Sequence, residues 1–149
     1  MVVMIHCGDC SGLMCTNVGD ERLRRNRRIL LVGSCVPTRF PGVLEQCRAD
    51  GGEHITLTVC LEETHMNMAG YKLASMVKYA GIEAVRVLTI DGSPHCTQLH
   101  HMVEDVKVHF APELETEHIV IERGKVHHVS SAAIKRARHL SKIVVNEDE

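Results

Sequence analysis

ILLVGSC (residues 29–35), HITLTVCL (54–61) and AVRVLTID (84–91) are three short apolar stretches, each long enough for one strand. A helical pattern follows each of them along the chain. Strands that alternate with helices form a parallel sheet, and the crossovers between them are right-handed. We therefore expect these three stretches to run parallel in one sheet.

Helical patterns fill the intervals between the strands. One helix begins at Pro41 and is stopped by Gly51-Gly52, the usual arrangement of proline at the start and glycine after the end. A second covers roughly 67–80 and ends at Gly81. A third follows GSP (92–94), with a buried stripe formed by Leu99, Met102, Val103, Val106 and Phe110. The pattern predicts a three-layer, Rossmann-like α/β fold with helices on both faces of the sheet.

The chain after Pro112 changes character. EHIVIE (117–122), a turn at 123–125 and VHHV (126–129) predict a β-hairpin. This hairpin either extends the sheet with an antiparallel edge or serves as an oligomer arm, which would allow a homodimer. A C-terminal amphipathic helix follows, with Ser130 as its N-cap and Ile134, Ala137 and Leu140 facing inward.

Composition sets the class of the protein. The 149 residues are 44% hydrophobic and 24% charged, as in an ordinary single-domain protein. We expect a Cys- and Arg-rich segment at 1–28, one α/β domain at 29–145 and an acidic tail at 146–149. No apolar run approaches the ~20 residues that cross a bilayer, so we expect a cytoplasmic protein without membrane attachment.

The net charge of −2 gives no general attraction to nucleic acid. The Arg-rich stretch at 21–28 lacks the interleaved aromatic residues of a nucleic-acid-binding surface. We interpret this stretch as a solvated face and disfavour a nucleic-acid partner.

Reactive side chains gather where the three predicted strands end. The first strand ends at Cys35, the second is followed by Cys60, Glu62, Glu63 and His65, and the third leads to Asp91, His95 and Cys96. The carboxyl ends of parallel strands form one edge of the sheet, and ligands bind in the crevice outside it. The sequence therefore predicts a site at this edge.

DGSPHCTQLH (91–100) is the segment richest in chemistry. We expect its helix to begin near Cys96 or Thr97, where free N–H groups and the helix dipole would lower the pKa of the Cys96 thiol. His100 lies four residues later, on the same helical face. Cys96, His100 and Asp91 are therefore our candidate catalytic residues, and Arg39 is a candidate for binding an anionic substrate or cofactor.

Seven cysteines and eleven histidines favour metal binding or thiol chemistry over a disulfide framework. Cys47 lies on the apolar side of its helix, and we assign it to the core. A second cluster lies at the N-terminus, where His6 precedes Cys7, Cys10 and Cys15. The C-x-x-C pair can bind one metal, so this cluster predicts a zinc site or part of an iron–sulfur cluster.

Residues 29–104 resemble the core of the β-class carbonic anhydrases. The resemblance rests on Cys35-x-x-x-Arg39 after the first strand, LASMVKYAGIEA (73–84), VRVLTID (85–91) and the histidine-containing turn. That family places Cys-x-Asp-x-Arg after one strand and His-x-x-Cys after a later one, and binds zinc through them. Here Pro37 occupies the aspartate position, and Asp91, His95 and Cys96 stand where His-x-x-Cys is expected. The resemblance implies zinc at Cys35 with His95 or Cys96.

Two functional hypotheses follow. In the first, a zinc-like ion at the strand ends is bound by Cys35 and by His95 or Cys96, with Asp91 as a further ligand or as a partner of the ligands. The ion activates water or a small substrate, as in a small-molecule lyase or hydrolase. In the second, the chain is an iron–sulfur redox or electron-transfer accessory protein. Cys7, Cys10 and Cys15 would then hold the cluster, and the α/β core would dock a redox partner protein.

Overall fold

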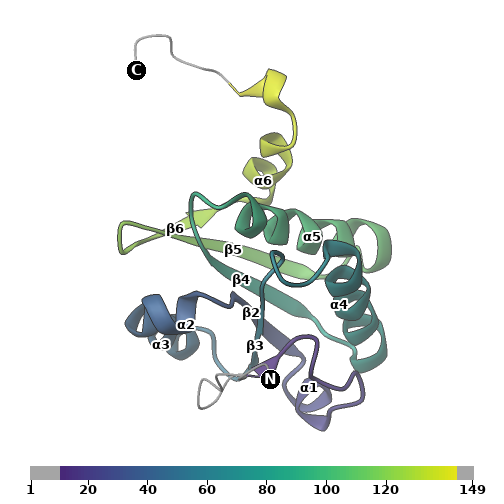
Figure 1. The fold of residues 1–149 in the computed structure, drawn as a ribbon. Coiled ribbons are helices and arrows are strands. Elements are labelled where there is room, and N and C mark those ends of the chain that lie inside the picture. The colour runs from purple at the N-terminus through teal and green to yellow at the C-terminus, as the bar shows by residue number, and fades with distance from the viewer. Residues whose placement is uncertain (1–10, 144–149) are drawn as a thin grey trace, which may run out of the picture.

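A six-stranded sheet forms the centre of the protein in the computed structural model, which describes residues 11–143 (Figure 1). The strand order is β1-β3-β2-β4-β5-β6, with β1 to β5 parallel and β6 antiparallel to β5. The strands are β1 (Ser11–Gly12), β2 (Arg28–Gly33), β3 (Ile55–Val59), β4 (Ala84–Ile90), β5 (Glu115–Glu122) and β6 (Lys125–Val129). The predicted parallel sheet is confirmed, and the hairpin extends it with an antiparallel edge.

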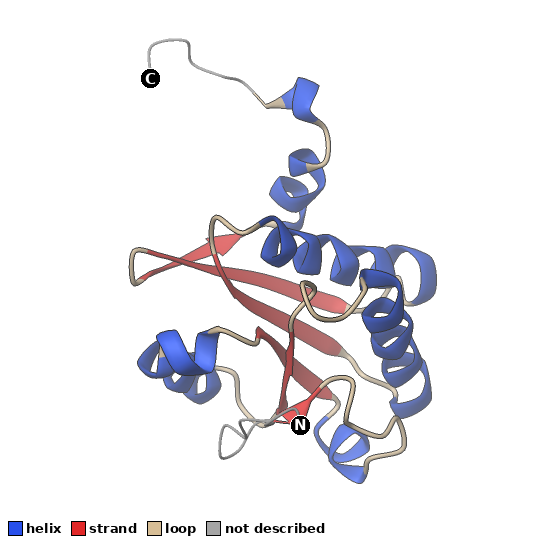
Figure 2. Cartoon of the chain, in the orientation of Figure 1, coloured by secondary structure: helices blue, strands red, loops and turns tan. Residues whose placement is uncertain are grey.

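Helices cover both faces of this sheet, as Figure 2 shows. One face carries α1 (Glu21–Asn26), α4 (Met66–Ala80) and α5 (Pro94–Phe110). The other carries α2 (Val36–Arg39) and α3 (Pro41–Asp50). The short α6 (Ser131–Ala137) and a 3-10 turn (Leu140–Lys142) follow β6. The three-layer, Rossmann-like α/β architecture is therefore confirmed.

The central strand β2 explains why its sequence is apolar throughout. Ile29 and Leu31 belong to the core beneath α4 and α5, whereas Leu30 and Val32 belong to the core beneath α2 and α3. Successive side chains of a strand point to opposite faces, so a strand covered on both sides needs apolar residues at every position. Cys47 is buried in the second core, as predicted.

Local chemistry sets the helix boundaries. The Asp20 carboxylate caps α1 by accepting a hydrogen bond from the Arg22 N–H, and the His65 ring caps α4 in the same way through Asn67. Gly81 ends α4 in the left-handed conformation that glycine adopts without strain. Helix α5 begins at Pro94, two residues before the predicted start, because proline fits the first turn of a helix.

Several sequence-based boundaries differ from the structure. Residues 11–28 share the domain's core, because Leu13 and Leu23 are fully buried in it and β1 pairs with β3. Phe110 is 49% exposed and Leu140 is 83% exposed, so neither belongs to the predicted buried stripes. Ala137 is also exposed, and Ile134 is the only buried residue of α6, because the chain leaves the body of the domain there (Figure 1).

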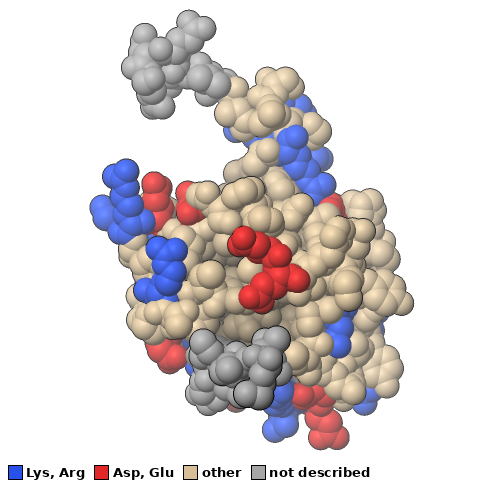
Figure 3. All heavy atoms as spheres, viewed as in Figure 1, with Lys and Arg blue, Asp and Glu red and all other residues tan. Residues whose placement is uncertain are grey.

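The part of the chain that the structure describes contains no helix that is both long and apolar enough to cross a membrane. Lys and Arg side chains form no continuous patch on the face drawn in Figure 3, where acidic side chains occupy the centre.

A pair of glycine substitutions tests the packing beneath the sheet. A Cβ at Gly51 would overlap the Arg86 guanidinium, which donates to the Cys47 carbonyl oxygen at 2.8 Å and pairs with Glu117. We expect Gly51→Ala to lower the free energy of unfolding by about 1–2 kcal/mol. Gly42 lies in α3 with nothing within 4 Å of its Cβ position, so Gly42→Ala should be neutral or stabilising by up to about 1 kcal/mol. Urea denaturation measures both, and an equal response would contradict this account.

Candidate functional site

A cavity of about 370 Å³ opens at the carboxyl ends of β2, β3 and β4. Strand β2 continues into α2 and α3 on one face of the sheet, whereas β4 continues into α5 on the other face. The chain connections therefore diverge at this point, which is where open α/β sheets bind their ligands. The lining residues include Gly33, Cys35, Arg39, Cys60, Glu62, Asp91, His95 and Cys96.

Three thiols share this cavity. Cys35 follows β2, Cys60 follows β3, and Cys96 lies in the first turn of α5. Gly33, at the end of β2, brings the backbone close to the third thiol, because a Cβ there would lie 3.9 Å from Cys96 Sγ and 3.7 Å from the Thr89 methyl carbon. Three successive strands of the sheet thus each bring one sulfur to the same hollow.

The structure brings together most of the residues selected from the sequence. Cys35, Arg39, Asp91, His95 and Cys96 all line the one cavity. In the described part of the chain, no carboxylate forms an ion pair with Arg39. Its guanidinium carbon lies 5.8 Å from the centroid of the Phe40 ring. Arg39 can therefore offer its charge to an anion in the cavity.

His100 is not part of this group. Its ring is 2% exposed, and both of its nitrogens are engaged, Nε2 with Thr89 and Nδ1 with His118. Burial, together with the nearby His118 and His101, lowers the pKa of His100 to about 3. The predicted partnership between the Cys96 thiol and a charged His100 ring is therefore wrong, because His100 faces the sheet and is neutral.

The predicted lowering of the Cys96 pKa is also wrong. Burial raises the pKa of this thiol, and the neighbouring Cys35 and Cys60 add to the rise through like-charge repulsion. Hydrogen bonds with Ser93 and with the backbone of Ile90 act in the opposite direction but do not prevail. Cys96 is a protonated thiol when the cavity holds no cation.

Within residues 11–143, no three His, Cys, Asp or Glu side chains already stand in a metal-binding arrangement. In the N-terminal cluster, Cys7 and Cys10 lie outside the described residues. Cys15 is exposed, in a turn that follows β1. Because β1 runs parallel to β3, this turn lies at the same edge of the sheet as Cys60.

Cys60 is the member of the site that sequence reasoning left without a role. The sequence places its thiol at the end of a strand, next to the titratable residues Glu62, Glu63 and His65. The signal that would have selected it is its position directly after Val59, where β3 stops.

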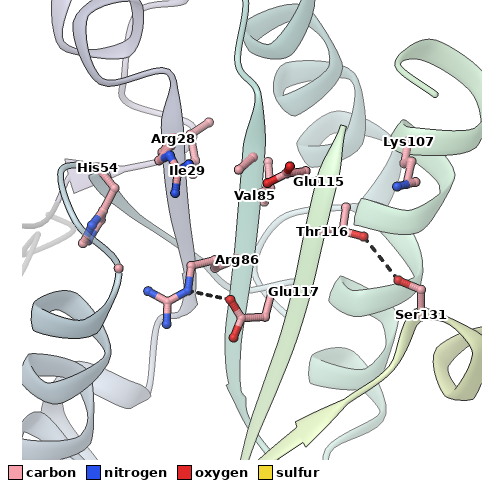
Figure 4. Close-up of a pocket in the computed structure, with 12 residues that line it drawn as sticks. Arg28, Ile29, His54, Val85, Arg86, Lys107, Glu115, Thr116, Glu117 and Ser131 are labelled. Atoms are coloured by element: carbon pink, nitrogen blue, oxygen red, sulfur yellow. Dashed lines mark hydrogen bonds and ion pairs between the residues drawn. The ribbon is translucent and has the colours of Figure 1, made fainter. Parts of the chain in front are cut away.

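A second cavity, of about 470 Å³, lies at the opposite edge of the sheet (Figure 4). Its charged groups are largely satisfied from within the protein. Arg86 Nε donates to Glu117 at 3.0 Å, and Lys107 Nζ donates to the Leu114 carbonyl oxygen at 2.6 Å. This internal pairing distinguishes it from the thiol cavity, where Arg39 is available.

Thiol reactivity provides a direct test of the site. In metal-free protein at neutral pH, we expect iodoacetamide to modify the exposed Cys35 several-fold faster than Cys96, whose thiol is partly buried with a raised pKa. Cys47 should be slowest, because it is buried and burial raises its pKa as well. Peptide mapping by mass spectrometry measures these rates, with urea-unfolded chain as the control. Faster modification of Cys96 than of Cys35 would contradict the geometry.

A comparison with protein families finds one match that covers most of the chain. A family model described as a Rossmann-like domain matches residues 22–148. No curated protein and no solved structure matches the sequence.

Proposed function

Since the chain belongs to the family of this Rossmann-like domain, we propose that it binds its ligand at the carboxyl edge of the sheet, and that this ligand is a thiophilic divalent metal ion such as zinc. The metal would be bound by the three thiols of Cys35, Cys60 and Cys96, which line the cavity at this edge. The observation that carries the proposal is the shared cavity: three separate strand ends supply one sulfur each. Zinc binds readily to clusters of cysteine thiolates in proteins.

The remaining residues of the cavity suit a site that keeps one position open. Zinc takes four ligands, and three protein ligands leave a position for water or substrate. His95 and Asp91 line the same hollow and provide either a fourth ligand or a partner for bound water. A bound zinc ion would supply Lewis acidity for a lyase or hydrolase reaction. Arg39 would orient a small anionic substrate beside it.

Metal binding must draw the thiols together, because the metal-binding arrangement is not preformed within residues 11–143. The connections that follow β2 and β3 carry Cys35 and Cys60, so small adjustments there leave the strands in place. An ion that binds only this closed arrangement would also stabilise the fold, by about 2.7 kcal/mol at a hundredfold excess over its Kd.

Titration of metal-free protein with Zn²⁺ or Co²⁺ tests the proposal. We expect one ion per chain, thiolate-to-Co²⁺ absorption bands, and a loss of affinity of about tenfold or more in each of Cys35→Ser, Cys60→Ser and Cys96→Ser. Cys47→Ala is the matched control, because Cys47 is buried in the core away from the cavity. Unchanged affinity in all three serine variants would refute the proposal.

A second candidate, an iron–sulfur redox protein, is favoured by the position of Cys15. The turn that holds Cys15 lies at the same edge of the sheet as the strand that ends before Cys60. A cluster held by Cys7, Cys10 and Cys15 would then sit at this edge and exchange electrons with a partner protein. Anaerobic reconstitution with iron and sulfide separates the two functions. A brown protein whose colour survives Cys35→Ser and Cys96→Ser but is lost in Cys15→Ser would support the cluster.

A further inference from the structure

A continuous chain of hydrogen bonds runs between the sheet and α5. Thr89 Oγ1 on β4 lies 2.8 Å from His100 Nε2, and His100 Nδ1 lies 2.8 Å from His118 Nδ1 on β5. His118 Nε2 lies 2.6 Å from Glu104 Oε1 on α5. Thr89, His100 and His118 are each no more than 2% exposed.

The chain ends on a carboxylate held by three donors. Besides His118, the Thr116 hydroxyl on β5 and the Ser131 hydroxyl on α6 each donate to Glu104 Oε1 at 2.8 Å. Figure 4 shows Thr116 and Ser131 facing one another. Burial opposes ionisation of Glu104, but the hydrogen bonds outweigh it and lower the pKa of its carboxyl group.

Ionised Glu104 fixes every hydrogen in the chain. A carboxylate only accepts, so His118 must donate from Nε2, and the Nδ1 of a neutral His118 must accept. His100 must then donate from Nδ1 and accept at Nε2, where the Thr89 hydroxyl donates. Only one assignment of the hydrogens satisfies all three bonds.

We infer that this chain of hydrogen bonds is a single-proton switch. Uptake of one proton by His118 reverses the direction of the two hydrogen bonds that link His118, through His100, to Thr89. A doubly protonated His118 donates from Nδ1 as well as Nε2, so His100 Nδ1 must accept. A neutral His100 then carries its proton on Nε2 and donates to Thr89. The Thr89 hydroxyl hydrogen must turn to another acceptor.

Both titratable groups that form hydrogen bonds with His118 lie on α5. Helix α5 contributes Glu104, His100 and, less closely, His101, and the uncharged Ser131 of α6 bonds to Glu104. Val87 on β4 and Val129 on β6, the register partners of His118, are also uncharged. In the part of the chain that the structure describes, Glu104 is therefore the carboxylate that pairs with the new imidazolium.

The far end of the switch adjoins the thiol cavity. The Thr89 methyl carbon and Cys96 Sγ both lie within 4 Å of the Cβ position of Gly33. A shift of the Thr89 side chain would therefore alter the packing next to Cys96, which lines the cavity. Proton uptake by the chain should therefore alter ligand binding between the thiols. This coupling rests on the function proposed above, whereas the reversal itself does not.

Two-bond ¹H–¹⁵N correlation spectra of full-length, ¹⁵N-histidine-labelled protein show which ring nitrogen carries each proton. With chelator present at about pH 8, we expect His100 protonated on Nδ1 and His118 on Nε2. At the acidic end of the pH series, the reversed form has His118 protonated on both nitrogens and His100 on Nε2. His100→Gln and His118→Gln assign the signals. A His100 that carries its proton on Nε2 at the higher pH, or keeps it on Nδ1 throughout, overturns the inference.

Thr89 variants separate a switch from a merely structural bond. Thr89→Val removes the acceptor that the reversed His100 needs, so the midpoint of the tautomer change should fall by about one pH unit, and Thr89→Ser should restore it. An unchanged midpoint in Thr89→Val overturns the switch.

Adding zinc chloride tests the coupling to the cavity. We expect zinc to shift the midpoint in the wild type but not in Cys96→Ser. Reversal without any zinc binding would refute the proposed function alone. Zinc binding without reversal would refute the switch alone, and zinc binding with an unshifted midpoint would refute the coupling.

Discussion

Replacing Glu104 with leucine is expected to lower the free energy of unfolding by about 3–6 kcal/mol. The substitution leaves the His118 N–H and the Thr116 and Ser131 hydroxyls without their shared acceptor. A buried donor without a partner costs about 1–3 kcal/mol; His118 is fully buried and Thr116 is half-buried. Urea denaturation monitored by circular dichroism measures the loss.

Two variants make this result interpretable. Glu113→Leu removes an exposed carboxylate just after α5 and should change stability by no more than about 0.5 kcal/mol. Glu104→Gln keeps an acceptor oxygen and should give an intermediate loss, which remains measurable even where the leucine variant does not fold. A leucine variant as stable as the wild type would show that the three hydrogen bonds do not hold α5 and α6 to the sheet.

The fold could be predicted from the sequence because the decisive signals are local. The apolar runs that became β2, β3 and β4 are bounded by glycine, proline and polar residues, and Gly81 ends α4 where the pattern indicated. The strand β1 could not be predicted in this way. It has only two residues, Ser11 and Gly12, and exists because it pairs with β3.

The site could be predicted in outline but not in its electrostatics. Topology alone brings Cys35, His95 and Cys96 to one edge of the sheet. The pKa of Cys96 depends instead on burial and on two thiols from other strands, which outweigh the helix terminus that the sequence shows.

The role of His100 was missed for a similar reason. Helical spacing places it on the same face as Cys96, but its partner is His118, eighteen residues away on β5. Pairing between distant segments leaves no periodic signal in a single sequence.

His100 also makes the stability of the protein depend on pH. Its pKa is about 3 in the folded protein and near 6.5 in the unfolded chain, so between these values the unfolded state binds a proton that the folded state excludes. Stability is therefore full above about pH 6.5 and falls as the pH is lowered, by up to about 1.4 kcal/mol per unit. From pH 6.5 to 5, before most carboxylates titrate, the expected loss is about 2 kcal/mol, measured by urea denaturation at several pH values. His54 and His101, whose pKa values are also lowered by burial, add smaller losses of the same sign.

In His100→Gln, stability should fall less steeply with decreasing pH, because the contribution of His100 is removed: glutamine binds no proton in either state. Parallel profiles for the wild type and His100→Gln would mean that the folded protein admits the proton, and that His100 is not held neutral by its burial.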